Sequence, residues 1–341
     1  MLRAAVENGN RCLGFDLDPL AVLMATVWTS RGCEGLEDEA RRVVARAKQL
    51  PKGAPSWHDC AETEAFTKFW FEEKQRADLS AIARVLADYE GAHLNALRLA
   101  LSRLVITKEK GASIARDTSH SRPHRWFFDN DFDVMRALPI AAKRIEERLN
   151  AEALKGSAEV AKGDARELNL EAASIDAVIT SPPYLNAIDY MRGHRLALVW
   201  LGYRLRDLRE VRSSSIGAEA AKDKPANLEL PAFELAEGLR DSQKRIVERY
   251  RADIHRLMIE LKRVVKPGGT VLVVVGNSNI AGVPVSNADI NEASARSVGF
   301  ELKQRFDRDL PAQSRYLPTP KEDDTTLGRR MRTETVLSFA A

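Results

Sequence analysis

The feature that most constrains the fold is a series of strand-like apolar runs separated by helical segments in the second half of the chain. The runs are AEVAKGDA, IDAVITSPPY and GTVLVVVGNS. A long helical pattern, QKRIVERYRADIHRLMIELKRVV, precedes the last of them, and we expect that helix to stop at Pro267-Gly268-Gly269. Because buried strands alternate with helices, the sequence predicts an α/β fold with a mostly parallel sheet.

A similar strand and helix open the chain. A short apolar run over residues 12–15 ends at Asp16, and Asp18-Pro19 then precedes the apolar pattern LAVLMATVW. We expect Asp18 to be the N-cap of a helix and Pro19 its first residue. Amphipathic helical patterns follow, and we interpret them as an insertion into the sheet domain. The expected divisions are an N-terminal part of the core at 1–32, a helical insertion for target recognition or closure at 33–157, and the rest of the core at 158–341 with a surface excursion at 207–240.

Composition predicts an ordinary cytoplasmic protein with no membrane partner. No apolar run approaches the ~18 residues of a membrane span, and the N-terminus lacks the apolar core of a signal peptide. Cys12, Cys33 and Cys60 are widely spaced, so neither a disulfide framework nor a thiolate zinc site is indicated. His120 and His124 flank a proline and lack a third ligand, so we expect no metal. The net charge of +3 permits a local basic surface for nucleic acid without indicating one.

Polar side chains follow three of the expected strands, at Asp16, at Asp164 and at 180–184. Ligands bind at the carboxyl ends of strands in open parallel sheets. A carboxylate there can accept hydrogen bonds from both hydroxyls of a ribose, and a second one can accept from an adenine amine. Asp16 could equally cap the next helix, and Gly163-Asp164 is also a common turn.

The TSPPY loop at 180–184 is the more specific signal. An exocyclic amine on a nucleobase is a poor nucleophile, because its lone pair is delocalised into the ring. A site that activates it must accept hydrogen bonds from the amine and hold the ring by its face. The Ser181 hydroxyl and the Ser181 or Pro182 carbonyl are suitable acceptors, the tandem prolines make the loop rigid, and Tyr184 offers a stacking surface. A proline-rich turn with a packed tyrosine is the alternative interpretation.

The ordered set GFDLDPLA, GDARELN, DAVITSPPYLNAIDY, RVVKPGGTVLVVVGNS and TETVLSFA resembles the amino-methylating DNA methyltransferases that use S-adenosylmethionine, and S-P-P-Y resembles their cytosine N4 branch most. The match covers roughly residues 10–32 and 158–341. The resemblance implies a Rossmann-like sheet with an antiparallel last strand, direct displacement at the sulfonium methyl, and a base that is flipped or single-stranded. It also implies the site residues: Asp16 at the ribose, Asp164 and Ala165 at the adenine, Thr180 in the cofactor site, and Ser181, Pro182, Pro183 and Tyr184 at the target base.

One element of the family's pattern is absent from this sequence. Members begin with a strand and an Asp-Pro-Phe-x-Gly-x-Gly type loop, whereas residues 2–19 resemble the end of the helix that follows that loop. The missing strand is central in the family's sheet, so we expect the strands near 12–16 and 175–180 to have unpaired edges. We hypothesise a truncated or split enzyme whose N-terminal segment another chain supplies. In-frame family sequence upstream, or in an adjacent reading frame, would support this hypothesis, and a normal start signal with no such neighbour would count against it.

Further residues are candidates for contact with nucleic acid. SHSRPHRWFF at 119–128 interleaves basic and aromatic residues that could meet phosphates or bases, although a loop docked on the protein would look the same. Other polar residues directly follow the TSPPY loop, where helix packing alone could also place them. The candidates are Arg122, Arg125, Trp126, Asp189, Tyr190 and Arg195.

These patterns together favour S-adenosylmethionine-dependent methylation of an exocyclic amine in DNA, with cytosine N4 favoured over adenine N6. An RNA guanine N2 methyltransferase is the alternative enzyme, because related loops serve that chemistry. An inactive remnant that only binds nucleic acid or a protein is the alternative from another class. Affinity for the cofactor would separate the remnant from the two enzymes.

Overall fold

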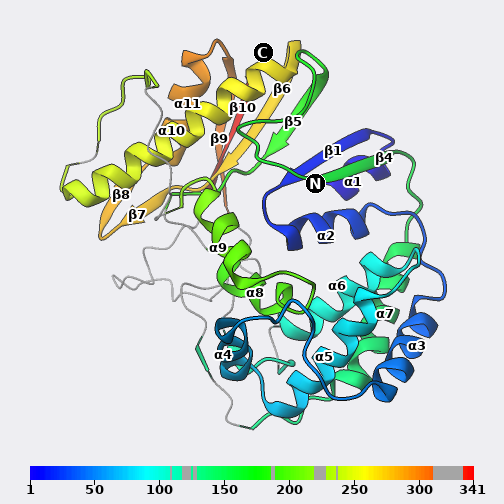
Figure 1. Ribbon diagram of the computed structural model, residues 1–341. Coiled ribbons are helices and arrows are strands. Elements are labelled where there is room, and N and C mark those ends of the chain that lie inside the picture. The colour runs from blue at the N-terminus through cyan, green and yellow to red at the C-terminus, as the bar shows by residue number, and fades with distance from the viewer. Residues whose placement is uncertain are drawn as a thin grey trace. The chain divides into compact units, whose positions relative to one another are not determined.

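The computed structural model describes residues 1–107, 110–116, 124–125, 129–185, 189–218, 228–235, 237–309 and 333–341 (Figure 1). The chain divides into two compact units. The first comprises Met1–Gly163 and Ile188–Arg212, and the second comprises Asp164–Ala187 and Ser213–Ala341. Both units combine strands with helices, which confirms the predicted α/β class.

The first unit opens with the strand and helix that the sequence predicts. After α1 (Leu2–Glu7), β1 (Arg11–Asp16) pairs with β4 (Ser157–Lys162) in a parallel sheet. α2 (Pro19–Trp28) follows β1, and the Asp18 carboxylate accepts a hydrogen bond from the backbone N–H of Leu20 at 2.8 Å. The predicted N-cap and the proline start of this helix are therefore confirmed.

Residues 33–157 are mainly helical, as their amphipathic pattern predicts. Their helices bury Leu36, Leu97 and Leu138 in one hydrophobic core together with Leu20 of α2. Full burial of each such side chain contributes about 1.5–3 kcal/mol. The remaining elements of the unit are α3 (Leu36–Gln49), α4 (Ala61–Trp70), α5 (Glu73–Ala87), α6 (Leu94–Val105), β2 (Ala115–Arg116), β3 (His124–Arg125), α7 (Val134–Asn150), α8 (Met191–Leu198) and α9 (Leu205–Ser214). The domain boundaries expected from the sequence, and the role of this segment in target recognition, stay predictions.

The second unit contains a four-stranded sheet in the order β5-β6-β10-β9. β5 and β6 are parallel, and β10 is antiparallel to both β6 and β9, so the predicted antiparallel last strand is confirmed. The helices α10 (Asp241–Val264) and α11 (Asn287–Ser297) lie side by side and pack on this sheet (Figure 1). The core of the unit includes Tyr250, Val273 and Phe339. The elements are β5 (Ile175–Thr180), α10 (Asp241–Val264), β6 (Val265–Val275), β7 (Ser278–Ile280), β8 (Val283–Val285), α11 (Asn287–Ser297), β9 (Glu301–Asp309) and β10 (Thr333–Ala340).

The predicted end of α10 is wrong by a few residues. The helix ends at Val264, and the Lys266-Pro267-Gly268-Gly269 segment already belongs to β6. A residue that precedes proline is disfavoured in the helical region, so Lys266 cannot continue the helix. Gly268 has a φ of 77°, which only glycine adopts without strain, and the β5–β6 register shifts between Ile175 and Ala177. The strand therefore starts before the turn that was expected to precede it.

Among the described residues, β1 and β5 are edge strands of their sheets. Within the ranges that the structure describes, β1 pairs only with β4 and β5 pairs only with β6. Ile179 of β5 is 54% exposed, although an apolar residue in a central strand is normally buried. These edge positions agree with the expectation from the sequence, and the missing strand itself stays a prediction.

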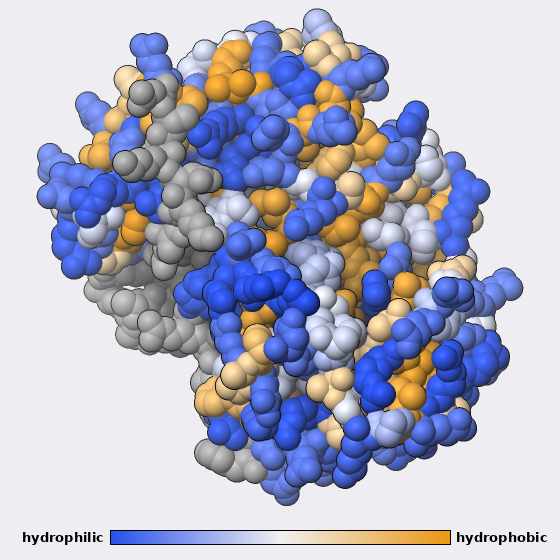
Figure 2. Space-filling model, in the orientation of Figure 1, coloured by the Kyte–Doolittle hydropathy of each residue, from blue (hydrophilic) through white to orange (hydrophobic). Residues whose placement is uncertain are grey.

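The hydropathy of the surface agrees with the charged fraction of 30% in the sequence. The face shown in Figure 2 is predominantly hydrophilic, with smaller hydrophobic patches among the hydrophilic residues. Among the helices of the described residues, none has both the length and the apolar character needed to cross a membrane.

Candidate functional site

The TSPPY loop lies at the carboxyl end of β5. Thr180 is the last residue of the strand and pairs with Val273 of β6, after which the prolines end the pairing. Pro182 is buried, whereas Ser181 and Pro183 are exposed. The Tyr184 side chain is half-buried and packs against the core of the second unit. The loop thus presents one hydroxyl and one aromatic ring from a firmly held backbone.

A chain of polar contacts connects this loop to the last two strands. The Ser181 Oγ lies 3.4 Å from the Tyr184 hydroxyl, and that hydroxyl donates to Glu334 Oε1 at 3.1 Å. Arg308 of β9 donates to Glu334 Oε2 from Nε at 3.1 Å and from Nη2 at 2.8 Å. The sequence analysis did not identify Glu334 or Arg308 as site residues, because TETVLSFA was considered only as one of the family-like motifs and Arg308 lies outside all of them. A carboxylate at the start of a largely apolar strand was the available signal.

Asp164 is held by an ion-pair network in the second unit. The guanidinium of Arg166 donates to both carboxylate oxygens, from Nε at 3.0 and 3.2 Å and from Nη2 at 2.6 Å, and its backbone N–H donates to Oδ1 at 2.9 Å. Arg166 also donates to Asp253 of α10. An adenine amine at Asp164, as the sequence predicts, would share these oxygens with Arg166. Ala165 lies in the same turn and is half-buried.

The Arg166 network gives Asp164 a pH-dependent role in stability. Burial acts to raise the pKa of Asp164, but the hydrogen bonds and charge of Arg166 outweigh it and hold the pKa below its ordinary value. A lowered folded-state pKa stabilises the fold above the unfolded value of about 3.9, and this contribution is lost as pH falls through the folded pKa. We expect Asp164→Asn to lower the free energy of unfolding by about 1–2 kcal/mol near neutral pH.

The difference between wild type and Asp164→Asn should shrink below about pH 4, because the wild-type carboxyl then also becomes neutral. Urea unfolding monitored by circular dichroism from pH 7 to pH 3 measures it. Asp176→Asn is a matched control, since that carboxylate is exposed and its partner is an exposed lysine. A difference that stays constant over this pH range would contradict the assigned role of the Asp164 charge.

Asp16 belongs to the first unit, where it ends β1. Its Oδ1 accepts a hydrogen bond from the backbone N–H of Asp18 at 2.8 Å, so it stabilises the turn before α2. The backbone N–H of Leu17 also interacts with this carboxylate, and burial raises the pKa of Asp16 above its ordinary value. Asp18 caps α2 through one oxygen and contacts His194 Nδ1 through the other at 2.5 Å. Both interpretations of Asp16, turn residue and ribose acceptor, agree with this geometry.

Asp189, Tyr190 and Arg195 lie in a basic cluster of the first unit. Arg192 Nε and Arg212 Nε donate to the same oxygen of Asp189, at 3.0 and 2.5 Å. The guanidinium of Arg195 lies 5.2 Å from the ring centroid of Phe66, and its buried Nε has no hydrogen-bond partner among the described residues. Burial and the positive charge of Arg212 lower the pKa of Arg195. Tyr190 is exposed. The Asp189 carboxylate therefore lies near more positive guanidinium charge than its single negative charge can neutralise.

Of the other predicted nucleic-acid contacts, the structure describes Arg125 only. This residue is exposed, and its guanidinium lies 5.2 Å from the ring centroid of Phe69. Arg122 and Trp126 lie outside the described residues. In the part of the chain that the structure describes, no group of three His, Cys, Asp or Glu side chains could hold a metal ion.

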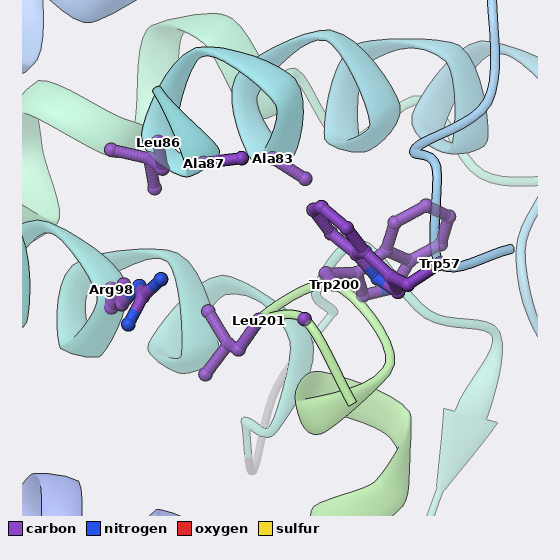
Figure 3. A pocket seen from close by; sticks show the side chains of 8 residues that line it. Trp57, Ala83, Leu86, Ala87, Arg98, Trp200 and Leu201 are labelled. Atoms are coloured by element: carbon purple, nitrogen blue, oxygen red, sulfur yellow. The ribbon is translucent and has the colours of Figure 1, made fainter. Parts of the chain in front are cut away.

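A small cavity in the first unit contains none of the predicted site residues. Side chains of α5 and α6, including Leu86 and Arg98, face Trp57 and Trp200 across it (Figure 3). Its volume is about 30 Å³, which is enough for one or two water molecules and too small for a nucleobase. Its neighbour Trp200 is fully buried, and within the part of the chain that the structure describes its indole N–H has no hydrogen-bond partner.

Comparison with known proteins identifies methyltransferases as relatives. No family model matches the chain. The type II methyltransferase M.AvaI from Nostoc sp. is 26% identical over 151 residues, which are 38% of this chain and 31% of the relative. The type II methyltransferase M.BsoBI from Geobacillus stearothermophilus is 26% identical over 182 residues, which are 42% of this chain and 36% of the relative. The chain thus spans about a third of the length of the curated relatives it matches.

Among solved structures, a putative DNA modification methylase from Thermus thermophilus in complex with S-adenosyl-L-methionine is 18% identical. The match covers 52% of this chain and 53% of that one, with a TM-score of 0.30. An S-adenosylmethionine-dependent methyltransferase from Methanosarcina mazei is 11% identical, with 58% and 76% covered and a TM-score of 0.27. The sequence relatives confirm the resemblance to DNA methyltransferases that the ordered motifs of this chain predict.

Proposed function

We propose that this chain takes part in methyl transfer from S-adenosylmethionine to an exocyclic amine of a DNA base, most favourably cytosine N4. The observation that carries the proposal is the TSPPY loop at the carboxyl end of β5, where Ser181 is exposed and its hydroxyl lies 3.4 Å from the hydroxyl of Tyr184. The type II methyltransferases among the relatives of the chain support the same chemistry.

The loop residues would activate the amine by position and polarity. Ser181 and a loop carbonyl accept hydrogen bonds from the amine, which draws its lone pair out of the ring and toward the electrophile. Tyr184 holds the face of the base, because its ring is anchored at the hydroxyl by Glu334. A base inside a duplex cannot reach such a loop, so the substrate base must be flipped or single-stranded.

S-adenosylmethionine, when bound, would supply the electrophilic methyl group. Asp16 fits the ribose, because its carboxylate ends β1, and each carboxylate oxygen can accept more than one hydrogen bond. Asp164 and Ala165 fit the adenine less freely, since Arg166 occupies both oxygens of Asp164. Thr180 ends the strand that leads into the target-base loop and would lie where cofactor and base meet.

We infer that a further parallel strand completes the fold in the active protein. Within the described residues, β1 and β5 each have one edge without a partner strand and Ile179 is exposed, and these features support the inference, because an open strand edge presents backbone N–H and C=O groups that another strand can pair. The strand could come from another segment or from a partner chain. The same free edges favour the second candidate function, a binding module that lacks activity by itself.

Two measurements on the purified chain test the proposal. Calorimetric titration with S-adenosylmethionine measures cofactor binding. Incubation with unmethylated bulk DNA, followed by mass spectrometry of the nucleosides, identifies the modified base without knowledge of the recognition sequence. N4-methyldeoxycytidine supports the proposal, N6-methyldeoxyadenosine moves the target to adenine, and methylated guanosine from an RNA substrate favours the alternative enzyme. Cofactor binding without transfer to any substrate would favour the binding module.

A further inference from the structure

The strongest further signal is the connection between the TSPPY loop and Glu334, which is 150 residues away from Tyr184 in the sequence. We propose that Glu334 is a positioning residue that fixes the direction of the hydrogen bonds in the loop, so that Ser181 faces the target amine as an acceptor. This inference rests on the proposed function of the loop and assigns a new residue to it.

The direction of the bonds follows from the number of protons. The Tyr184 hydroxyl has one hydrogen, and an ionised carboxylate has none to give, so Tyr184 must donate to Glu334. In the long contact of 3.4 Å between Ser181 and Tyr184, the tyrosine oxygen can then act only as acceptor. Ser181 therefore directs its own hydrogen toward Tyr184. Its lone pairs remain available to an N–H group of the substrate.

Arg308 fixes the orientation of the Glu334 carboxylate. Its two hydrogen bonds end on Oε2, which leaves Oε1 for Tyr184. The Glu334 side chain is only 14% exposed, and its Oε2 accepts both hydrogen bonds from Arg308, so none of these contacts needs a proton on the carboxylate. The backbone supports the contact as well, since Glu334 and Arg308 are paired residues of β10 and β9. The register between β10 and β9 thus determines the direction of the hydrogen bonds at Tyr184 and Ser181.

Reversal of these hydrogen-bond directions would oppose the reaction. With an amide at position 334, the Arg308 guanidinium would attract the amide oxygen, and the amide NH₂ would then face Tyr184. Tyr184 would accept that bond and donate to Ser181, which would turn the serine hydrogen outward. A donor on Ser181 would meet the donors of the target amine. The cofactor contacts proposed for Asp16 and Asp164 would not change.

A double-mutant cycle tests the inference. We expect Glu334→Gln to lower kcat for DNA methylation by about 10- to 100-fold, with affinity for S-adenosylmethionine changed by less than about twofold. In a Tyr184→Phe background, Glu334→Gln should reduce kcat further by no more than about twofold, because the hydroxyl through which it acts is absent. Glu301→Gln, on the same sheet and exposed beside Lys303, is the matched control and should leave kcat unchanged. Rate losses that multiply independently would overturn the inference.

The same cycle can be measured without substrate. If Glu334 acts on the Tyr184 hydroxyl, the decreases in melting temperature caused by Tyr184→Phe and Glu334→Gln should be less than additive in the double variant. Additive decreases would overturn the inference. This readout also separates it from the proposed function, since a wild-type chain that transfers no methyl group to any nucleic acid counts against the function, while the stability cycle still decides on Glu334.

Discussion

Ser181→Ala is expected to lower methyl transfer to DNA by about 100- to 1000-fold, as removal of one oriented polar group from a transition-state site does in other enzymes. The Ser181 hydroxyl is the proposed acceptor for the amine. The loop has two other side-chain hydroxyls, those of Thr180 and Tyr184. Affinity for S-adenosylmethionine should change by less than about twofold. Quantitative nucleoside analysis and calorimetry measure the two properties.

Two further variants sharpen this expectation. Tyr184→Ala should behave like Ser181→Ala, because it removes the stacking surface for the base, whereas Asp16→Ala should weaken cofactor binding more than it slows transfer at saturating cofactor. Ser174→Ala is a matched control, since that hydroxyl lies just before β5 and donates to the Glu171 carbonyl. If all three site variants lose both properties equally while remaining folded, the role assignments are wrong.

Arg195→Met should weaken DNA binding by about 10-fold and reduce the slope of log Kd against log salt by about one, as loss of one phosphate contact does. The cluster supports this expectation. Asp189 is already shared by two arginines, and Glu62 is paired with Arg209, so no carboxylate of the described residues forms an ion pair with Arg195 alone. Methionine keeps an apolar side chain against Phe66 while removing the charge.

The same substitution should raise the melting temperature, because burial of a guanidinium whose Nε has no acceptor is unfavourable. Weaker DNA binding combined with higher stability distinguishes a phosphate contact from a structural residue. Arg42→Met removes the same charge from a surface arginine that is paired with Glu39, and it should leave DNA binding unchanged. Fluorescence anisotropy with a labelled duplex at several salt concentrations is the measurement. Unchanged affinity and slope in Arg195→Met would exclude a phosphate contact at this position.

Local sequence patterns determined most of the elements of this protein. The alternation of apolar runs and helical segments predicted the parallel strands, and Asp18-Pro19 predicted the start of α2, because caps and periodicity depend on neighbouring residues. The end of α10 was placed too late, since the turn residues Pro267-Gly268-Gly269 lie inside β6 and not before it.

The identity of the TSPPY loop and its position after a strand were also determined by the sequence, as were the unpaired edges, which follow from the absence of one motif. Only the tertiary structure decided which groups surround that loop and Asp164. Glu334 and Arg308 meet Tyr184 through the pairing of β10 with β9, and Asp253 meets Arg166 from α10. Such contacts join residues far apart in the chain, and local periodicity contains no information about which distant side chains a sheet register brings together.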